Sequence, residues 1–79
     1  MGQIAEVLGA LARALVDRPE AVRLRERESG GELLLELDVD PDDRGRIIGR
    51  RGETIQALRA LLGAIAHKQQ MRCRVEVAE

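Results

Sequence analysis

An amphipathic helical pattern opens the chain. Between Gly2 and Val16, apolar residues recur at intervals of three and four, which predicts a helix with one buried side. Gly9 lies in the middle of this segment and marks either a close crossing with another helix or a tolerated residue that costs about 1 kcal/mol relative to alanine. Pro19 disfavours helical geometry at Arg18, so we expect the helix to end before it. The apolar residues of this pattern are Ile4, Val7, Leu8, Leu11, Ala12, Leu15 and Val16.

The pattern then changes to alternation, which is typical of half-buried strands. Within residues 21–28, Val22 and Leu24 alternate with Arg23 and Arg25, and residues 33–39 place a leucine or valine at every second position. Between them, Ser29-Gly30-Gly31-Glu32 has the composition of a tight turn. The two strands are therefore predicted to form a hairpin.

A short helix is predicted next, over residues 40–48. Asp40 suits the N-cap and Pro41 suits the first helical position. The two acids that follow fit the positive end of the helix, so we interpret this carboxylate group as capping rather than catalytic. Of Ile47 and Ile48, we expect one to anchor the helix in the core and the other to contact a ligand; the sequence does not assign which.

A longer helix and a last strand complete the chain. The helix is predicted over residues 53–69 and the strand over residues 71–78, where Cys73 falls on the apolar side as a structural thiol. His67 and Lys68 suit the negative end of the helix dipole. The residues expected to face the sheet from this helix are Ile55, Leu58, Leu61, Leu62 and Ile65.

These elements give an α+β fold in one domain, residues 1–79, with the order α-β-β-α-α-β. We expect a three-stranded sheet with the helices packed on one face. The chain has no Phe, Tyr or Trp, so aliphatic side chains must build the core. The same absence excludes modules that stack bases on aromatic rings, such as the RRM and many OB folds.

The bend between the last two helices, Gly49-Arg50-Arg51-Gly52, is the candidate functional site. Two glycines three apart permit a tight turn and let another backbone come close. The amides at the following helix start, together with two guanidinium groups, suit a phosphate. Because two adjacent arginines repel each other and bury nothing, a phosphate partner explains them better than a plain helix connection.

The distribution of charge supports an anionic partner. The net charge is −1, but residues 1–43 carry eleven acids and five bases, whereas residues 44–79 carry three acids and eight bases. Arg44 and Arg46 extend the basic character of the bend with no acid between Asp43 and Glu53. Arg59, on the following helix, is expected to enlarge the same surface.

The frame Ile47-Ile48-Gly49-Arg50-Arg51-Gly52-Glu53-Thr54-Ile55 resembles the signature of KH domains. In that family a Gly-x-x-Gly loop joins two helices and holds about four nucleotides of single-stranded nucleic acid. The element order resembles the type II (bacterial) KH domain over essentially all of the chain. The sequence is similar to the stand-alone bacterial RNA-binding proteins of the KhpA family, although Arg50 stands where the family often carries lysine.

This resemblance implies equilibrium binding of single-stranded RNA, with phosphates on the amides of Arg51 and Gly52 and bases against aliphatic side chains such as Ile48. It also implies a homodimer or a KhpB-type KH partner, and roles in RNA chaperoning and in post-transcriptional control of cell-wall synthesis, cell shape and division. The RNA-binding residues expected on this basis are Arg44, Arg46, Ile48, Gly49, Arg50, Arg51, Gly52, Thr54 and Arg59.

The competing interpretation is a protein–protein interaction module whose arginines meet acidic side chains. A nucleotide-binding enzyme is excluded by spacing, because Gly45, Gly49 and Gly52 form neither a dinucleotide fingerprint nor a P-loop. No cofactor, metal cluster or catalytic set is expected. One cysteine forms no internal disulfide, and the chain shows no secretory leader or membrane-length apolar run, so we expect a cytoplasmic protein. The choice between RNA and single-stranded DNA stays open.

Overall fold

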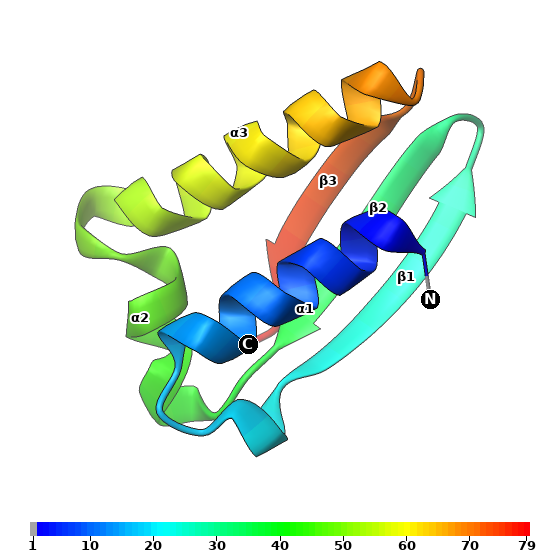
Figure 1. Ribbon diagram of the computed structural model, residues 1–79. Helices are drawn as coiled ribbons and strands as arrows, with labels where there is room; N and C mark the ends of the chain where they lie inside the picture. Colours follow the sequence, from blue (N-terminus) through cyan, green and yellow to red (C-terminus); the bar gives the residue numbers. More distant parts are fainter. Residues whose placement is uncertain (1) are drawn as a thin grey trace.

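A computed structural model describes residues 2–79, and it has the predicted element order (Figure 1). None of the helices in these residues is long and apolar enough to cross a membrane. Most element ends differ from the sequence prediction by one or two residues, because fraying and capping geometry are not encoded by periodicity. The exception is the helix predicted over residues 40–48, which is divided into η2 and α2. The elements are α1 (Gln3–Leu15), η1 (Pro19–Ala21), β1 (Arg23–Ser29), β2 (Glu32–Asp38), η2 (Pro41–Asp43), α2 (Arg44–Ile48), η3 (Arg50–Gly52), α3 (Glu53–Lys68) and β3 (Arg72–Val77).

The three strands form one sheet in the order β1-β2-β3. β1 and β2 are antiparallel and joined by a turn in which Gly30 (φ 55°) and Gly31 (φ 77°) both adopt the left-handed backbone that tight hairpins require. β2 and β3 are parallel, so the chain from Pro41 to Lys68 crosses over the sheet between them. The predicted α+β class, with helices on one face, is confirmed.

The core lies between the sheet and the two long helices, α1 and α3 (Figure 1). Leu33, Leu35 and Leu37 of the central strand are buried on the covered face, at 0–4% exposure. On the other face, Leu34 and Glu36 alternate with them and are only half-buried. Period-two alternation therefore sets which face of β2 receives the helices.

Gly9 marks a close approach, and the neighbour is a strand rather than another helix. A Cβ at this position would lie 3.1 Å from Leu24 Cδ1 on β1. The residue itself is buried in α1. The glycine thus lets α1 settle closely onto β1.

The sequence predicts the wrong orientation for one side chain of α3. Leu61 was predicted to face the sheet, but 48% of it is exposed to solvent. Its neighbours Leu58 and Leu62 are buried at 6% and 0%. At about 100° per residue, the side of α3 that contacts the sheet is centred on Leu62, and Leu61 turns outward.

Candidate nucleic-acid interface

The bend begins where Gly49 ends α2, and only glycine fits there. Its backbone (φ 78°, ψ 171°) lies in a region that L-residues rarely adopt. A Cβ on Gly49 would also lie 2.7 Å from the Thr54 Cβ and 2.8 Å from the Thr54 amide nitrogen. Thr54, half-buried, therefore packs directly beneath Gly49 and holds the bend from below.

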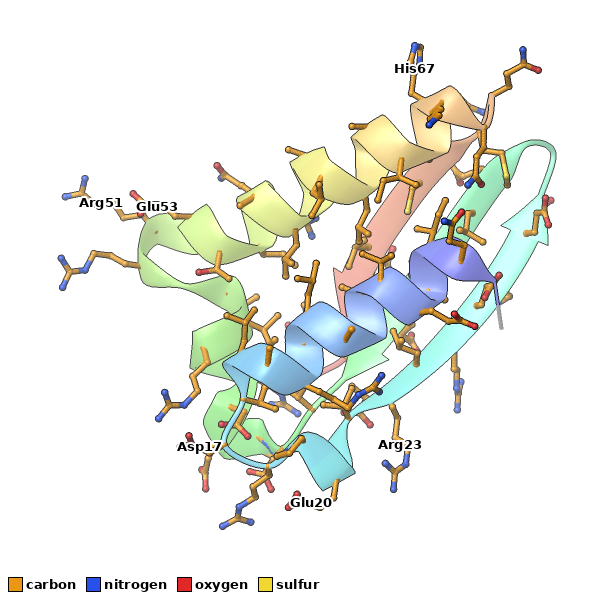
Figure 2. The ribbon with its side chains drawn as sticks, in the orientation of Figure 1. Asp17, Glu20, Arg23, Arg51, Glu53 and His67 are labelled. Atoms are coloured by element: carbon orange, nitrogen blue, oxygen red, sulfur yellow. The ribbon has the colours of Figure 1, made fainter. Side chains whose placement is uncertain are left out.

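Two arginines project from this bend and have no ion-pair partner in the part of the chain that the structure describes. Arg50 and Arg51 are exposed, and neither forms an ion pair with any of residues 2–79. Figure 2 shows Arg51 extending away from the bend into solvent. Arg51 adopts a left-handed backbone (φ 57°, ψ 22°), which is uncommon for a side chain of this size. The bend is thus neither buried nor neutralised by carboxylates.

Some backbone amides of the bend donate hydrogen bonds to carbonyl groups of the bend, and others do not. The Gly52 N–H donates to the Gly49 carbonyl at 3.1 Å, so in this conformation that amide is already used within the bend. The Glu53 N–H donates to the carbonyl of Arg50. Within residues 2–79, the amides of Arg50 and Arg51 make no hydrogen bond. The donors available to an anion therefore lie one residue earlier than predicted.

The two isoleucines before the bend have separate positions. Ile47 is fully buried, at 0% exposure, whereas Ile48 is 37% exposed at the end of α2. This resolves the alternative that the sequence left open. Ile47 anchors α2 in the core, and Ile48 presents an aliphatic surface beside the bend.

Arg46, although predicted with the bend, belongs to an ionic cluster below α2. Its Nη2 lies 2.8 Å from Asp17 Oδ2 and its Nε lies 3.3 Å from Asp43 Oδ1. Asp43 is 2% exposed and also accepts the backbone N–H groups of Asp17 and Arg18, each at 3.1 Å. We call Asp43, Asp17 and Arg46 the Asp43 cluster; it ties the end of α1 to the start of α2.

The capping prediction for this segment is correct for Asp40 and incomplete for Asp43. The Asp40 carboxylate accepts the Asp42 N–H at 2.9 Å, as an N-cap does. Asp43 instead caps a turn 26 residues earlier in the chain. Nothing in the local sequence signals that contact.

The remaining two predicted arginines lie apart from the bend. Arg44 is half-buried, and its Nε is buried without a partner among the described residues. Arg59 extends from α3 to β3, where its Nε and Nη2 both donate to the carbonyl of Val75, at 3.2 and 3.0 Å. Arg59 is thereby held at the edge of the sheet.

A groove that the sequence did not predict runs along this edge. It has a volume of about 390 Å³ and is lined by Arg59, Cys73, Arg74, Val75 and Glu76. The amide of Arg72 donates to the carbonyl of Gly31, just before β2, and the amide of Ala78 donates to that of Leu37 in β2. By alternation, the peptide groups of residues 73, 75 and 77 therefore point outward. Apart from the Val75 carbonyl, these outward groups form an open edge that can hydrogen-bond a ligand.

The described residues contain no group of three or more His, Cys, Asp or Glu side chains able to hold a metal ion. Cys73 is half-buried on the helix side of β3, and this burial raises the pKa of its thiol. A raised pKa disfavours the thiolate, so Cys73 is a poor nucleophile. His67 lies at the opposite end of α3 from the bend (Figure 2).

A helix, two antiparallel strands, two helices joined by a Gly-x-x-Gly bend and a final parallel strand define a type II KH domain. A family model described as "KhpA/KhpB, KH domain" matches residues 5–77. The chain therefore belongs to the KhpA/KhpB family of KH domains, which is a family of binding domains and not of enzymes.

Several curated proteins resemble the chain along nearly its whole length. The RNA-binding protein KhpA of Halalkalibacterium halodurans is 45% identical over 69 residues, covering 87% of this chain and 91% of that protein. The RNA-binding protein KhpA of Caldanaerobacter subterraneus subsp. tengcongensis is 40% identical over 72 residues, covering 91% and 96%. The RNA-binding protein KhpA of Chlamydia pneumoniae is 40% identical over 74 residues, covering 94% and 95%.

A solved structure supports the fold independently. It is Era in complex with MgGDPNP and nucleotides 1506–1542 of 16S ribosomal RNA. The TM-score is 0.66 at 19% identity, with 94% of this chain and 28% of that chain covered. At this identity the likeness concerns the fold alone.

Proposed function

We propose that this KH domain binds single-stranded RNA across a surface that runs from the Gly49–Gly52 bend along α3 to the groove at the open edge of β3. The observation that carries the proposal is a pair of exposed arginines on a glycine-flanked bend, neither of which forms an ion pair with any described residue. Relatives at 40–45% identity bear the name RNA-binding protein, which supports RNA as the ligand.

Phosphates and bases would contact different parts of this surface. The guanidinium groups and free amides of Arg50 and Arg51 offer charge-assisted donors to phosphate oxygens. Ile48 offers apolar contact to a base, and the outward peptide groups of β3 offer donors and acceptors to base edges. Arg59 closes the far wall of the groove through its bonds to Val75.

This mode of binding implies modest affinity and clear salt dependence. The chain has no aromatic side chain on which bases can stack. Few phosphates are neutralised, and each contributes a slope of about −0.7 to the dependence of log K on log salt for single strands. A short footprint gains strength when two domains act together.

We further propose that the domain forms a homodimer through the exposed side of α3. We define the outer face of α3 as Ala57, Ala60, Leu61 and Ala64, which are spaced by three, four and seven residues and are all exposed. Leu61 is the most prominent apolar side chain on it, at 48% exposure. The chemistry of this face is that of a helix–helix contact rather than of a solvated surface.

The outer face is symmetric in a way that favours a second copy of the chain as its occupant. Counting outward from Ala60 and Leu61, Ala57 and Ala64 lie three residues away, and Glu53 and Lys68 lie seven residues away. A twofold axis at the centre would therefore place Glu53 of each copy beside Lys68 of the other. Antiparallel packing also opposes the two helix dipoles favourably.

Such a dimer is expected to be weak. A contact confined to one helix per copy buries less than the ~800 Å² per partner that is usual for stable interfaces. RNA held by both copies would therefore strengthen the dimer. The resemblance to the KhpA family extends the proposal to a KhpB-type partner, and to RNA chaperoning and post-transcriptional control of cell-wall synthesis, cell shape and division in the cytoplasm.

The test of RNA binding is the double variant Arg50→Asp/Arg51→Asp, titrated with labelled single-stranded RNA. We expect an unchanged circular dichroism spectrum and at least a hundredfold loss of affinity. The matched control is Arg25→Asp/Arg27→Asp on β1, which makes the same change in net charge on exposed strand residues away from the bend. Equal losses in both variants would mean that only net charge matters, and retained binding would place the site elsewhere.

The competing function, a protein-interaction module, has support of its own in the outer face of α3. It differs from the main proposal in one measurable respect. Wild-type protein that self-associates or binds a KhpB-type partner, yet binds neither RNA nor single-stranded DNA, would establish it. Titration with both nucleic acids, with sedimentation of the same samples, separates these outcomes.

A further inference from the structure

The position of the groove relative to the outer face of α3 has a consequence for two bound RNA strands. α3 lies over the sheet, with α1 along one flank (Figure 1). The β3-edge groove lies along the other flank, where Arg59 of α3 and residues 73–76 line it. The outer face points away from the sheet, between these two flanks. A second copy docked on the outer face therefore leaves both grooves open.

We propose that the dimer holds two single strands antiparallel on one of its faces and so promotes the pairing of complementary RNAs. This inference rests on the proposed function, because it requires both RNA binding in the groove and docking through the outer face of α3. It adds the reaction that the assembly would promote: formation of a duplex from two single strands.

The direction of the strands follows from symmetry. An antiparallel helix pair is generated by a twofold axis that is perpendicular to both helices and to the line that joins them. This rotation reverses the direction of α3 and of the groove beside it. Whatever the direction of RNA relative to α3, the two bound strands must therefore run in opposite directions, as the strands of a duplex do.

The same axis decides on which face the strands lie. Rotation about it leaves each flank of α3 on its original side, so both grooves open on one face of the dimer and both α1 helices lie on the other. A parallel helix pair would instead put the grooves on opposite faces. The parallel arrangement brings Glu53 close to its own copy and Lys68 close to its own copy, so like charges disfavour it.

The spacing between the two strands suits pairing outside the grooves. Two helices, each about 10–12 Å across, separate the grooves, a distance comparable with the width of a duplex. Each KH groove engages only about four nucleotides, so the nucleotides that flank each bound segment stay free. Those flanking segments meet with the correct polarity and at a raised local concentration.

The experiment is a fluorescence-transfer annealing assay with two complementary RNAs, run beside sedimentation and single-strand binding on the same proteins. We expect wild type to accelerate annealing at least tenfold at concentrations where it dimerises. Leu61→Glu is expected to sediment as a monomer, to bind a short single strand that fills one groove with unchanged affinity, and to lose the acceleration. Arg50→Asp/Arg51→Asp is expected to dimerise without accelerating annealing.

A charge exchange supplies the matched control. Glu53→Lys and Lys68→Glu, made singly, each place like charges together across the twofold axis and should reduce both dimerisation and annealing. The double variant Glu53→Lys/Lys68→Glu restores opposite charges and should recover both.

A second readout tests polarity directly. Two non-complementary RNAs, each carrying one binding segment and one terminal dye, are held by the wild-type dimer. Energy transfer should be higher when the dyes are on a 5′ end and a 3′ end than when both are on 5′ ends.

The inference is overturned if the wild-type protein dimerises and binds single strands but does not accelerate annealing, if monomeric Leu61→Glu anneals as fast as wild type, or if the polarity readout shows parallel strands. Failure to bind single strands, or failure to dimerise, would refute the proposed function itself.

Discussion

Arginines on either side of Gly49 have the same chemistry and different surroundings. Arg46, three residues before it, lies in the Asp43 cluster, with Asp17 at 2.8 Å and Asp43 at 3.3 Å. Arg50 and Arg51, directly after it, have no ion pair within residues 2–79. A few residues thus separate a cation that holds the fold together from cations that are free for a ligand.

This difference shows how the domain can carry an exposed, strained bend. The Asp43 cluster fixes α2 against the end of α1, and Ile47 fixes the same helix in the core. The bend that follows can then keep uncommon backbone angles and unpaired charge, because its flanking elements are held elsewhere. Substitutions in the cluster are expected to lower stability, whereas substitutions of the two arginines of the bend are expected to lower RNA affinity.

The largest expected effect is that of Gly49→Ala. The new Cβ meets Thr54 in a backbone conformation reserved for glycine, so we expect a loss of about 4 kcal/mol in the free energy of unfolding. Gly52→Ala is the control, because Gly52 also has positive φ (74°) but a Cβ there would make only ordinary contacts, at 3.8 Å or more. It should lose about 1 kcal/mol. Equal losses in urea unfolding would mean that the contact with Thr54 does not define the bend.

Asp43→Ala should follow, with a loss of about 3 kcal/mol. It leaves two backbone N–H groups without an acceptor and removes the buried partner of Arg46. Asp17→Ala removes only an exposed partner of Arg46 and should cost under about 1 kcal/mol. Chemical denaturation gives both values, and a loss below that of Asp17→Ala would contradict the structural role assigned to Asp43.

Arg51→Asn should separate stability from binding. Asparagine tolerates left-handed backbone better than arginine, so the free energy of unfolding should rise by up to about 1 kcal/mol. RNA affinity should fall about tenfold, since one charge-assisted contact is lost. Thermal unfolding and RNA titration of the same sample measure the two changes. A variant that is less stable and binds normally would reverse the assignment.

The smallest expected effect is a change in the salt dependence of RNA affinity, which should occur on substitution of Arg50 and not of Arg46. Arg50→Gln should reduce the slope of log K against log salt by about 0.7, the value for one phosphate on a single strand. Arg46→Gln should leave that slope unchanged, because its guanidinium already has carboxylate partners. RNA titrations at several salt concentrations give the slopes. A reduced slope in Arg46→Gln would mean that Arg46 leaves Asp17 and Asp43 to meet RNA.

The sequence predicted the structural features that depend on residues close together along the chain. Helical and alternating periods gave the element order, and Gly49 and Asp40 were correctly placed at a helix end and a helix start. The exposed, unpaired arginines of the bend agree with the proposed interface, whose contacts with RNA stay predictions.

What the sequence could not supply depends on contacts between distant segments. Asp43 meets Asp17 across 26 residues, so the different surroundings of Arg46 and Arg50 are invisible in a local run of arginines. The groove at the edge of β3 exists only once β3 pairs with β2. Leu61 was assigned to the core because an apolar residue one position from Leu62 matches a broad helical stripe equally well.

The bend lies within the chain segment that connects the parallel strands β2 and β3. Parallel neighbours in a sheet need a long crossover, and here that crossover is η2, α2, the bend and α3. A ligand bound at the bend would consequently stabilise the crossover, which is the chain segment that connects the central strand to its parallel neighbour. Saturation with RNA should then raise the melting temperature and slow amide hydrogen exchange along β3.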